Sequence, residues 1–217
     1  MRTILLTVIF LFLTICTFAT GQISDKIIYK GKEYSLNTNP LEKFFEKNPN
    51  LKPNIKIPFS ALWRGYIATF EIQDKQLFVK DIVIMDEDTL NGAHKLTNKS
   101  VFNQVFPNQK QLKVDWLTGL LVIPYGKLVN YVHMGYASTY ENYILLEIDK
   151  GNLSQEKSMK RKEYEKFKEK QFKAFQKTDD YRNLKEELKK NGGGTDEFLD
   201  SFIQTYVIDY STKVLTK

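Results

Sequence analysis

Apolar positions follow two different periods along the chain, and the change falls close to residue 150. Between residues 23 and 150, short β-prone runs are separated by turn residues, whereas the last third shows the spacing of amphipathic helices. The clearest strand pair runs from Gly65 to Ile84, where apolar side chains alternate before the turn at Asp74-Lys75 and continue at Leu77, Val79, Ile82 and Ile84 after it. We count about seven such strands and expect a mainly antiparallel sheet.

Other runs predict the remaining elements of this region. A hairpin is expected at 26–30 and 33–36, joined at Gly31, and a second one at 112–116 and 120–123 around Thr118-Gly119. Asn39-Pro40 predicts a short helix with Asn39 as its N-cap and proline at the first helical position. Two further strands are expected at 127–133 and 143–148, a loop at 86–99, and a helical turn at 102–106.

Helical spacing dominates the last third of the chain. Residues 155–177 place four aromatic side chains on one broad face, which predicts a helix. Thr178 is expected to cap a second helix that ends at Gly192-Gly193-Gly194, and Thr195 to cap a third. The predicted fold is therefore α+β, an antiparallel sheet followed by C-terminal helices, with a β-rich domain at 22–151 and a charged helical region at 152–217.

The first 21 residues have the pattern of a secretory signal peptide. Met1-Arg2 is positively charged, Ile4 to Ile15 is almost wholly apolar, and Ala19-Thr20-Gly21 supplies small residues for signal peptidase. The apolar run is shorter than the roughly 20 residues of a spanning helix. We expect cleavage after Gly21 and a secreted or periplasmic protein; the alternatives are an uncleaved membrane anchor and a lipoprotein attached at Cys16.

Cysteine and histidine usage narrows the possible chemistry. Cys16 is the only cysteine, so a chain cleaved after Gly21 has no disulfide, no thiol nucleophile and no Cys-ligated zinc. The two histidines, His94 and His133, are far apart in the sequence, which disfavours a His-rich metal site. The sequence contains no phosphate-binding glycine loop, nucleophile elbow or zinc-protease motif. We therefore expect no cofactor and no metal.

Charge is concentrated in one segment. Residues 150–190 hold 14 Lys/Arg and 8 Asp/Glu, a balance of +6 that equals the net charge of the whole chain. Residues 155–190 could contact an anionic surface. Mixed Lys and Glu at helical spacing instead favour a solvated face with i,i+4 pairs. Export makes nucleic acid an improbable partner, and we predict none.

Two aromatic motifs are candidates for binding, each with a structural alternative. Trp63-Arg64-Gly65-Tyr66 could form a recognition surface from aromatic faces and a guanidinium. The favoured alternative buries Trp63 and Tyr66 in the core and pairs Arg64 with a carboxylate. Asp115-Trp116 could place a carboxylate at a strand end, although aspartate in turns usually accepts backbone N–H bonds.

A third motif is the densest cluster of polar and aromatic residues. It comprises Tyr131 to Tyr136 and Tyr140-Glu141. Strand alternation would place Tyr131 and His133 on one face, with Val132 and Met134 on the other. His133 could act with Glu141 or Asp115 as an acid/base pair, since histidine titrates near neutral pH. A lone histidine is more often a hydrogen-bonded structural residue.

These motifs, together with Ile28-Tyr29-Lys30-Gly31-Lys32-Glu33-Tyr34 and Thr118-Gly119, occur in an order that resembles a family of small bacterial proteins of unknown function. The resemblance covers about residues 26 to 151 and leaves out the basic C-terminal region. It implies a bacterial origin and one compact domain. It implies no catalytic or binding role for any residue.

The sequence thus favours an exported bacterial binding or interaction protein without enzymatic activity, whose partner is a protein or a cell-envelope ligand. One alternative is a hydrolase or lyase that uses His133 with Asp115 or Glu141. Another is a surface-associated protein held by its basic helices. The candidate binding residues are Trp63, Arg64, Tyr66, Asp115, Trp116, His133, Tyr136, Tyr140 and Glu141.

Overall fold

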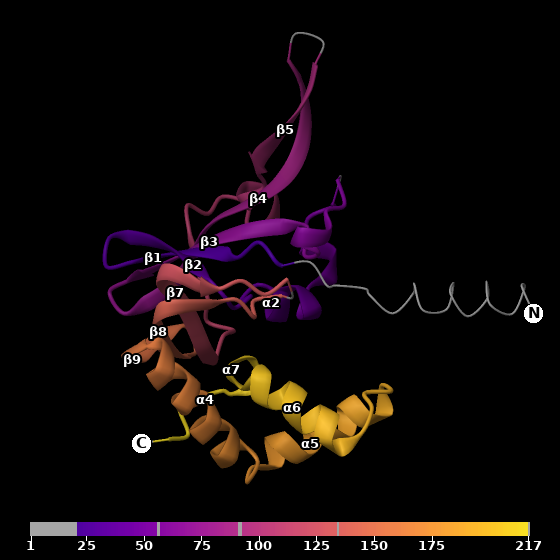
Figure 1. Cartoon of the computed structure of the whole chain (residues 1–217). Helices are drawn as coiled ribbons and strands as arrows, with labels where there is room; N and C mark the ends of the chain where they lie inside the picture. Colours follow the sequence, from indigo (N-terminus) through magenta and orange to yellow (C-terminus); the bar gives the residue numbers. More distant parts are fainter. Residues whose placement is uncertain (1–20, 56, 91–92, 134, 217) are drawn as a thin grey trace, which may run out of the picture.

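The computed structural model describes residues 21–55, 57–90, 93–133 and 135–216. It shows an α+β fold in which one sheet is followed by C-terminal helices (Figure 1), as the sequence predicts. The described strands are β1 (Asp25–Tyr29), β2 (Lys32–Leu36), β3 (Tyr66–Gln73), β4 (Gln76–Leu90), β5 (Ala93–Ser100), β6 (Leu112–Lys113), β7 (Gly119–Asn130), β8 (Thr139–Asp149) and β9 (Asn152–Lys160).

Short helices interrupt the sheet region and longer ones end the chain. The first group is α2 (Glu42–Lys47), the 3₁₀ turns η1 (Pro49–Leu51) and η2 (Ser60–Leu62), and α3 (Phe102–Val105). The second group is α4 (Arg161–Phe175), α5 (Asp179–Lys190), α6 (Asp196–Thr205) and α7 (Val207–Tyr210). Within the described ranges, every helix is too short or too polar to cross a lipid bilayer.

The strand order is β2-β1-β3-β4-β9-β8-β7, and β5 and β6 pair with β4 outside this path. All pairs are antiparallel except β1 with β3, so the sheet is mixed but mainly antiparallel. The sheet also curls, because Asn37, directly after β2, donates its N–H to the carbonyl of Val122 in β7 at 2.9 Å. The two ends of the strand order therefore lie side by side.

Two predicted hairpins are confirmed. β1 pairs with β2 across Lys30-Gly31, and β3 pairs with β4 across Asp74-Lys75. All four turn residues have positive φ. This is the left-handed geometry that a two-residue turn between twisted strands requires. The predicted helical turn at 102–106 is confirmed as α3.

Three predictions in the sheet are wrong. Residues 127–133 are not a separate strand, because β7 continues to Asn130 and residues 131–133 lie in the loop after it. Thr118-Gly119 does not join a hairpin, because β6 pairs with β4 while β7 pairs with β8. The predicted loop at 86–99 is wrong for the residues that the structure describes, since 86–90 and 93–99 form the outer part of the long β4–β5 hairpin that projects from the body (Figure 1). From Lys95 to Ser100 nearly every side chain is exposed. A strand pair with water on both faces has no apolar alternation for a sequence pattern to reveal.

Two predicted helix starts are also wrong. The helix expected from Gln155 begins at Arg161, because Lys150-Gly151 turns the chain and residues 152–160 pair with β8 as β9. Asn39 does not cap α2, whose N-cap is Leu41. Asn39 Oδ1 instead accepts a hydrogen bond from the Tyr136 hydroxyl at 2.9 Å.

The caps predicted for the last two long helices are confirmed. The side-chain oxygens of Thr178 and Thr195 accept hydrogen bonds from the N–H groups of Tyr181 and Phe198, respectively. These bonds satisfy donors that the first helical turn leaves free.

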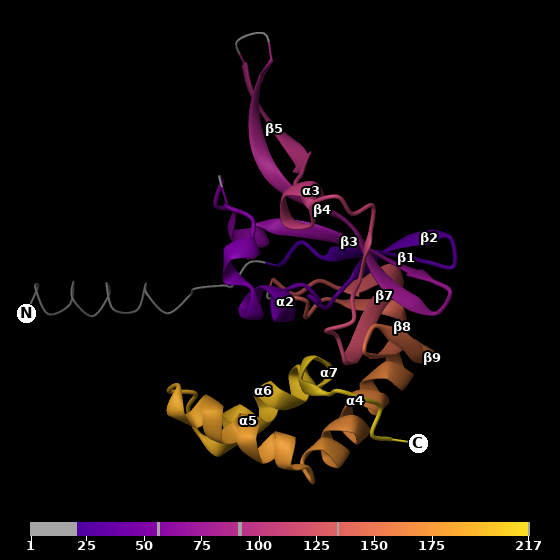
Figure 2. The same cartoon turned by 180° about the vertical axis from the view of Figure 1, so that it is seen from behind.

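The middle of the sheet is buried on both faces. Leu121 and Ile123 of β7, like Ile144 and Leu146 of β8, face the core enclosed by the curled sheet. Their neighbours Leu120, Val122, Tyr143 and Leu145 face a second core built by α4, α6 and α7. Figure 2 shows these helices lying beneath β7 and β8. The C-terminal helices therefore pack on the sheet.

Candidate functional site

Arg64, at the start of β3, is the centre of a buried polar network. Its Nη2 atom donates to Asp25 Oδ1 at 3.2 Å and to the Ile23 carbonyl at 2.9 Å, while Nη1 donates to the Tyr136 hydroxyl at 2.6 Å. The side chains of Arg64 and Asp25 have no exposed surface. The alternative in which Arg64 pairs with a carboxylate is therefore confirmed.

Burial opposes the charge on both partners of this ion pair. Burial raises the pKa of Asp25 to about 6, although Arg64 and the Ala68 N–H favour the carboxylate. Burial also opposes the Arg64 cation, but Asp25, Tyr136 and Tyr66 outweigh it and raise the pKa of Arg64. The guanidinium therefore remains charged, and Asp25 is the partner whose charge depends on pH.

Tyr66 and Trp63 differ although they are close in sequence. Tyr66 is buried, and its hydroxyl donates to Glu42 Oε1 at 2.6 Å. Trp63 is exposed, with the Lys52 ammonium 5.7 Å from its ring centroid. The favoured alternative of two core aromatics is thus confirmed for Tyr66 and wrong for Trp63, because the strand that would orient Trp63 inward begins only at Tyr66.

The structure places the other predicted residues apart from Arg64. Asp115 is exposed in the turn after β6. Trp116 donates from Nε1 to the Pro40 carbonyl at 3.1 Å and packs on Phe44. Glu141 is exposed and accepts from the Lys127 N–H at 2.9 Å. Tyr140 is half-buried. The hydrogen bonds of Trp116 and Glu141 thus have backbone partners within the fold.

His133 is exposed in the loop between β7 and β8. Its Nδ1 atom lies 2.9 Å from the Tyr131 hydroxyl. Among the described residues, neither Asp115 nor Glu141 contacts its ring, so the acid/base pair considered from the sequence is not assembled. The predicted opposite face includes Met134, which lies outside the described residues.

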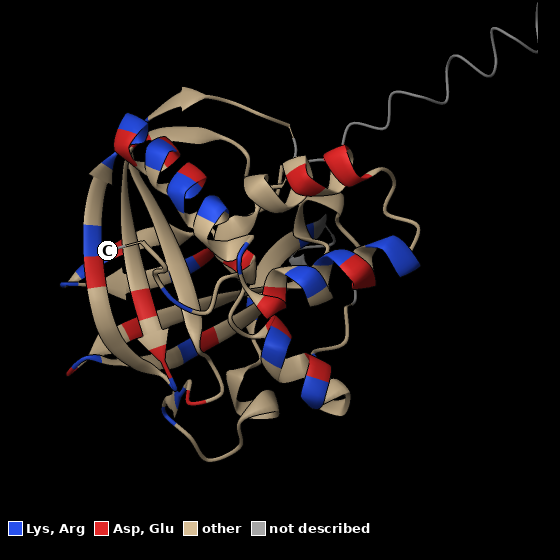
Figure 3. Cartoon of the chain, turned by 90° about the horizontal axis from the view of Figure 1, so that it is seen from below, with Lys and Arg blue, Asp and Glu red and all other residues tan. Residues whose placement is uncertain are grey.

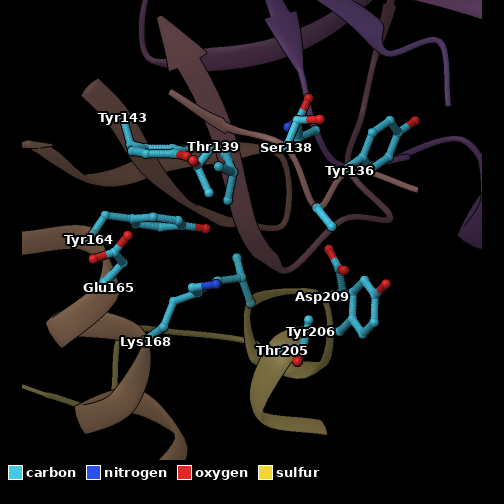
Figure 4. A pocket seen from close by; sticks show the side chains of 14 residues that line it. Tyr136, Ser138, Thr139, Tyr143, Tyr164, Glu165, Lys168, Thr205, Tyr206 and Asp209 are labelled. Atoms are coloured by element: carbon cyan, nitrogen blue, oxygen red, sulfur yellow. The ribbon is translucent and has the colours of Figure 1, made fainter. Parts of the chain in front are cut away.

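The best-enclosed cavity lies between the sheet and the C-terminal helices. Its volume is about 130 Å³, close to the roughly 150 Å³ that accommodates benzene in an engineered protein cavity. Figure 4 shows side chains from the β7–β8 loop, α4 and the α6–α7 junction facing it. The hydroxyl groups that line it belong to Tyr136, Ser138, Thr139, Tyr143, Tyr164, Thr205 and Tyr206.

Lys168 and Asp209 bring opposite charges to this cavity without pairing. Neither side chain makes a hydrogen bond or ion pair with a described residue, although the Lys168 ammonium lies 5.4 Å from the centroid of the Tyr164 ring. Burial lowers the pKa of Lys168, against the attraction of Glu165 and Asp209. Desolvation raises the pKa of Asp209, against Lys43 and Lys168. Asp209 keeps an exposed surface, so water at the cavity mouth limits that shift.

Stacked tyrosines form one wall of the cavity. Tyr143 of β8 and Tyr164 of α4 lie 4.1 Å apart between ring centroids with an interplanar angle of 18°. Tyr164 is buried, and burial raises its pKa beyond any physiological range. This wall therefore supplies neutral hydroxyl groups on rigid rings.

Tyr136 connects the cavity to the Arg64 network. It lines the cavity, and its hydroxyl accepts from Arg64 while donating to Asn39. It is the one predicted site residue that also lines this cavity among the described residues. Burial is the main cause that raises the pKa of Tyr136 to about 12, so the hydroxyl stays protonated.

The sequence patterns did not identify Lys168 or Asp209 as site residues. The spacing does place Lys168 on the buried face of α4, because it lies four residues after Tyr164 and four before Phe172, which are both buried. A lysine between two buried aromatic residues at helical spacing must turn its ammonium toward a cavity or toward solvent. Asp209 gave no comparable signal, because α7 is a single turn.

The described residues contain no group of three His, Cys, Asp or Glu side chains that could hold a metal ion. Lys/Arg and Asp/Glu positions are interspersed along the C-terminal helices (Figure 3). No family model, curated protein or solved structure matches this chain.

Proposed function

We propose that this chain is an exported bacterial protein that binds a small zwitterionic molecule, without enzymatic activity, in the cavity between the sheet and α4–α7. One observation carries the proposal. The Lys168 ammonium and the Asp209 carboxylate line the same cavity and make no hydrogen bond or ion pair with each other or with another described residue. Lys168 is partly buried, where an unpaired charge is costly, and Asp209 is exposed at the cavity mouth.

A ligand with one anionic and one cationic group would satisfy both side chains. Its carboxylate would accept from Lys168, and its ammonium would donate to Asp209. The hydroxyl groups around the cavity would hold the remaining polar atoms. The volume of about 130 Å³ restricts the ligand to roughly six or seven non-hydrogen atoms, by comparison with a cavity that holds benzene. A small amino acid has this size and charge pattern.

The other two functions considered from the sequence receive less support. The hydrolase or lyase requires His133 beside a carboxylate, and its hydrogen-bonding partner is Tyr131. Attachment to an anionic surface through residues 155–190 remains a prediction, which the mixture of charges on α4 and α5 does not favour.

The test uses three matched probes in chemical-shift titrations of the isotope-labelled protein. Alanine carries both charges, propionate only the negative one and ethylamine only the positive one. We expect alanine to bind at least tenfold more tightly than either single-charge probe, with shifts centred on residues that line the cavity. Equal affinity for all three probes, or no saturable binding of any, would contradict the proposal.

Variants then assign the binding to this cavity. Lys168→Met and Asp209→Asn each remove one charge and are expected to weaken alanine binding at least tenfold. Lys173→Met is the matched control, because Lys173 lies on the same helix with an exposed side chain. An equal loss in the control variant would place the binding elsewhere.

A further inference from the structure

Most of the exposed large apolar side chains of the described chain gather in two segments. Segment 51–63 contributes Leu51, Ile55, Phe59 and Trp63, and segment 128–131 contributes Leu128, Val129 and Tyr131. A soluble surface usually carries such residues singly, whereas a contiguous group marks an interaction site. We call these two segments together the apolar end of the molecule.

Both segments meet at the beginning of the described chain. Gln22 donates its N–H to the Gly135 carbonyl at 3.0 Å and its side-chain amide to the Ser60 carbonyl at 3.0 Å. Ile23 donates to the Ala61 carbonyl at 2.8 Å. The Tyr131 ring packs beside Gly21, where a Cβ atom would come within 3.3 Å of the hydroxyl oxygen.

The apolar end also contains a hollow. Gly21, Leu128, Tyr131 and Tyr140 are among the residues that line it, and its volume is about 260 Å³. Figures 1 and 2 show α2 and the segments around it on the side of the molecule where the described chain begins. The exposed side chains therefore surround the point at which the preceding residues leave the fold.

The preceding sequence indicates what covers this end. Six residue steps separate Ile15, the last residue of the apolar run, from Gly21, and they span at most about 20 Å when fully extended. A chain whose apolar run enters a bilayer, as a signal peptide or as an anchor, thus has its apolar end held close to the lipid surface. Hydrogen bonds fix Gln22 and Ile23 to the fold at this end.

The side chains also suit a membrane interface. Trp63 and Tyr131 are of the two types enriched where hydrocarbon meets water. Lys52 lies over the Trp63 ring and pairs with Glu42 at 3.0 Å, whereas Lys127 is exposed directly before Leu128. A lysine such as Lys127 can reach lipid phosphates while the neighbouring apolar atoms enter the bilayer.

We infer that the apolar end, segments 51–63 and 128–131, docks on the surface of a lipid bilayer. The contact is a peripheral one made by the folded protein, and it does not depend on the ligand in the cavity. It would hold the cavity-bearing body against the membrane through apolar contacts rather than through the basic residues 155–190.

Vesicle sedimentation tests this inference with the full chain as purified from producing cells, after intact-mass analysis has shown where its N-terminus lies. The double variant Trp63→Ser/Leu128→Ser removes two side chains that are 55% and 49% exposed. The matched control is Leu96→Ser/Phe198→Ser, whose side chains are 60% and 59% exposed on β5 and α6. Exposed positions seldom affect stability, so both variants should fold.

We expect the wild-type protein and the control to bind phosphatidylcholine vesicles equally, also in 0.5 M NaCl, and the test variant to bind at least fivefold less. Tryptophan emission should shift to shorter wavelength with vesicles, and Trp63→Phe should abolish that shift. Four results would overturn the inference. They are no binding to vesicles, an equal loss in the control, binding that requires anionic lipid and disappears in salt, and self-association that the test variant removes.

Discussion

Arg64 Nη1 donates a hydrogen bond to the hydroxyl of Tyr136 at 2.6 Å, across 72 positions of the sequence. This bond ties the beginning of β3 to the loop that lines the cavity. Removing one partner of a buried hydrogen bond leaves the other unsatisfied, at a cost of about 1–3 kcal/mol. We therefore expect Tyr136→Phe to lower the free energy of unfolding by that amount in urea titrations.

Tyr131→Phe is the control for Tyr136→Phe. The Tyr131 hydroxyl also makes one side-chain hydrogen bond, to His133, but both residues are exposed. Water can replace that bond, so its loss should change the free energy of unfolding by less than about 0.5 kcal/mol. If the two variants were equally stable, the Arg64–Tyr136 bond would contribute nothing beyond a surface contact.

Asp25 predicts a pH dependence of stability. Its pKa is about 6 in the folded chain against an ordinary value of 3.8. The folded state therefore holds a proton that the unfolded state loses, and the stability from this group is fully present below about pH 4 and is lost as pH rises through 6. We expect a contribution about 1 kcal/mol larger at pH 5 than at pH 7.5.

Urea titrations give the free energy of unfolding of wild type and Asp25→Asn at both pH values. The contribution of Asp25 is the change between the two pH values in wild type minus the same change in the variant. Asparagine keeps an acceptor for the Ala68 N–H but does not titrate. Because the variant also leaves Arg64 without its ion-pair partner, it could be too unstable to compare. A carbon-13 titration of the Asp25 carboxyl in the wild-type protein is then decisive. A midpoint near 4 would contradict the prediction.

Two glycines with the same backbone geometry should respond differently to substitution. Gly31 and Gly151 have φ values of 74° and 75°. A Cβ atom at Gly31 would meet nothing within 4 Å, whereas at Gly151 it would lie 2.6 Å from the Val114 carbonyl oxygen. We expect Gly31→Ala to cost about 1–2 kcal/mol from left-handed backbone alone, and Gly151→Ala clearly more. Thermal unfolding of both variants checks the order.

Replacing Lys168 should separate stability from binding. The ammonium is partly buried and has no hydrogen-bonding or ion-pair partner among the described residues. Methionine has similar length and no charge to desolvate, so Lys168→Met should leave the free energy of unfolding unchanged or raise it by up to about 1 kcal/mol. A marked fall in melting temperature would mean that Lys168 stabilises the fold and is not kept for a ligand.

Local chemistry explains which elements the sequence predicts correctly. The turns at Gly31 and Asp74-Lys75 and the caps Thr178 and Thr195 depend on residues within a few positions. The strand at 152–160 was missed because its pairing with β8, not its own composition, decides its structure. Four of its nine residues are polar or charged types that also suit a helix, namely Gln155, Glu156, Lys157 and Lys160.

The candidate site was harder to predict for a similar reason. Tyr136 was identified because it lies in an unusual aromatic cluster. Lys168 and Asp209 belong to separate helices, and their shared cavity exists only when α4 and α7 pack on β7 and β8. For Trp63 the sequence favours a place in the core, but the structure leaves its side chain exposed. Tertiary packing, which no local pattern encodes, decides both cases.

The double burial of β7 and β8 sets an order of events during synthesis. These strands cannot cover their outer side until residues 207–210 have left the ribosome, because α7 completes the second core. A nascent chain consequently carries a sheet with one uncovered apolar face from the completion of β8 at Asp149 until α7 has been synthesised. Translocation in an unfolded state would avoid aggregation through this uncovered face. A chain that stalls or ends before α7 would expose the face and be bound by chaperones or degraded by proteases.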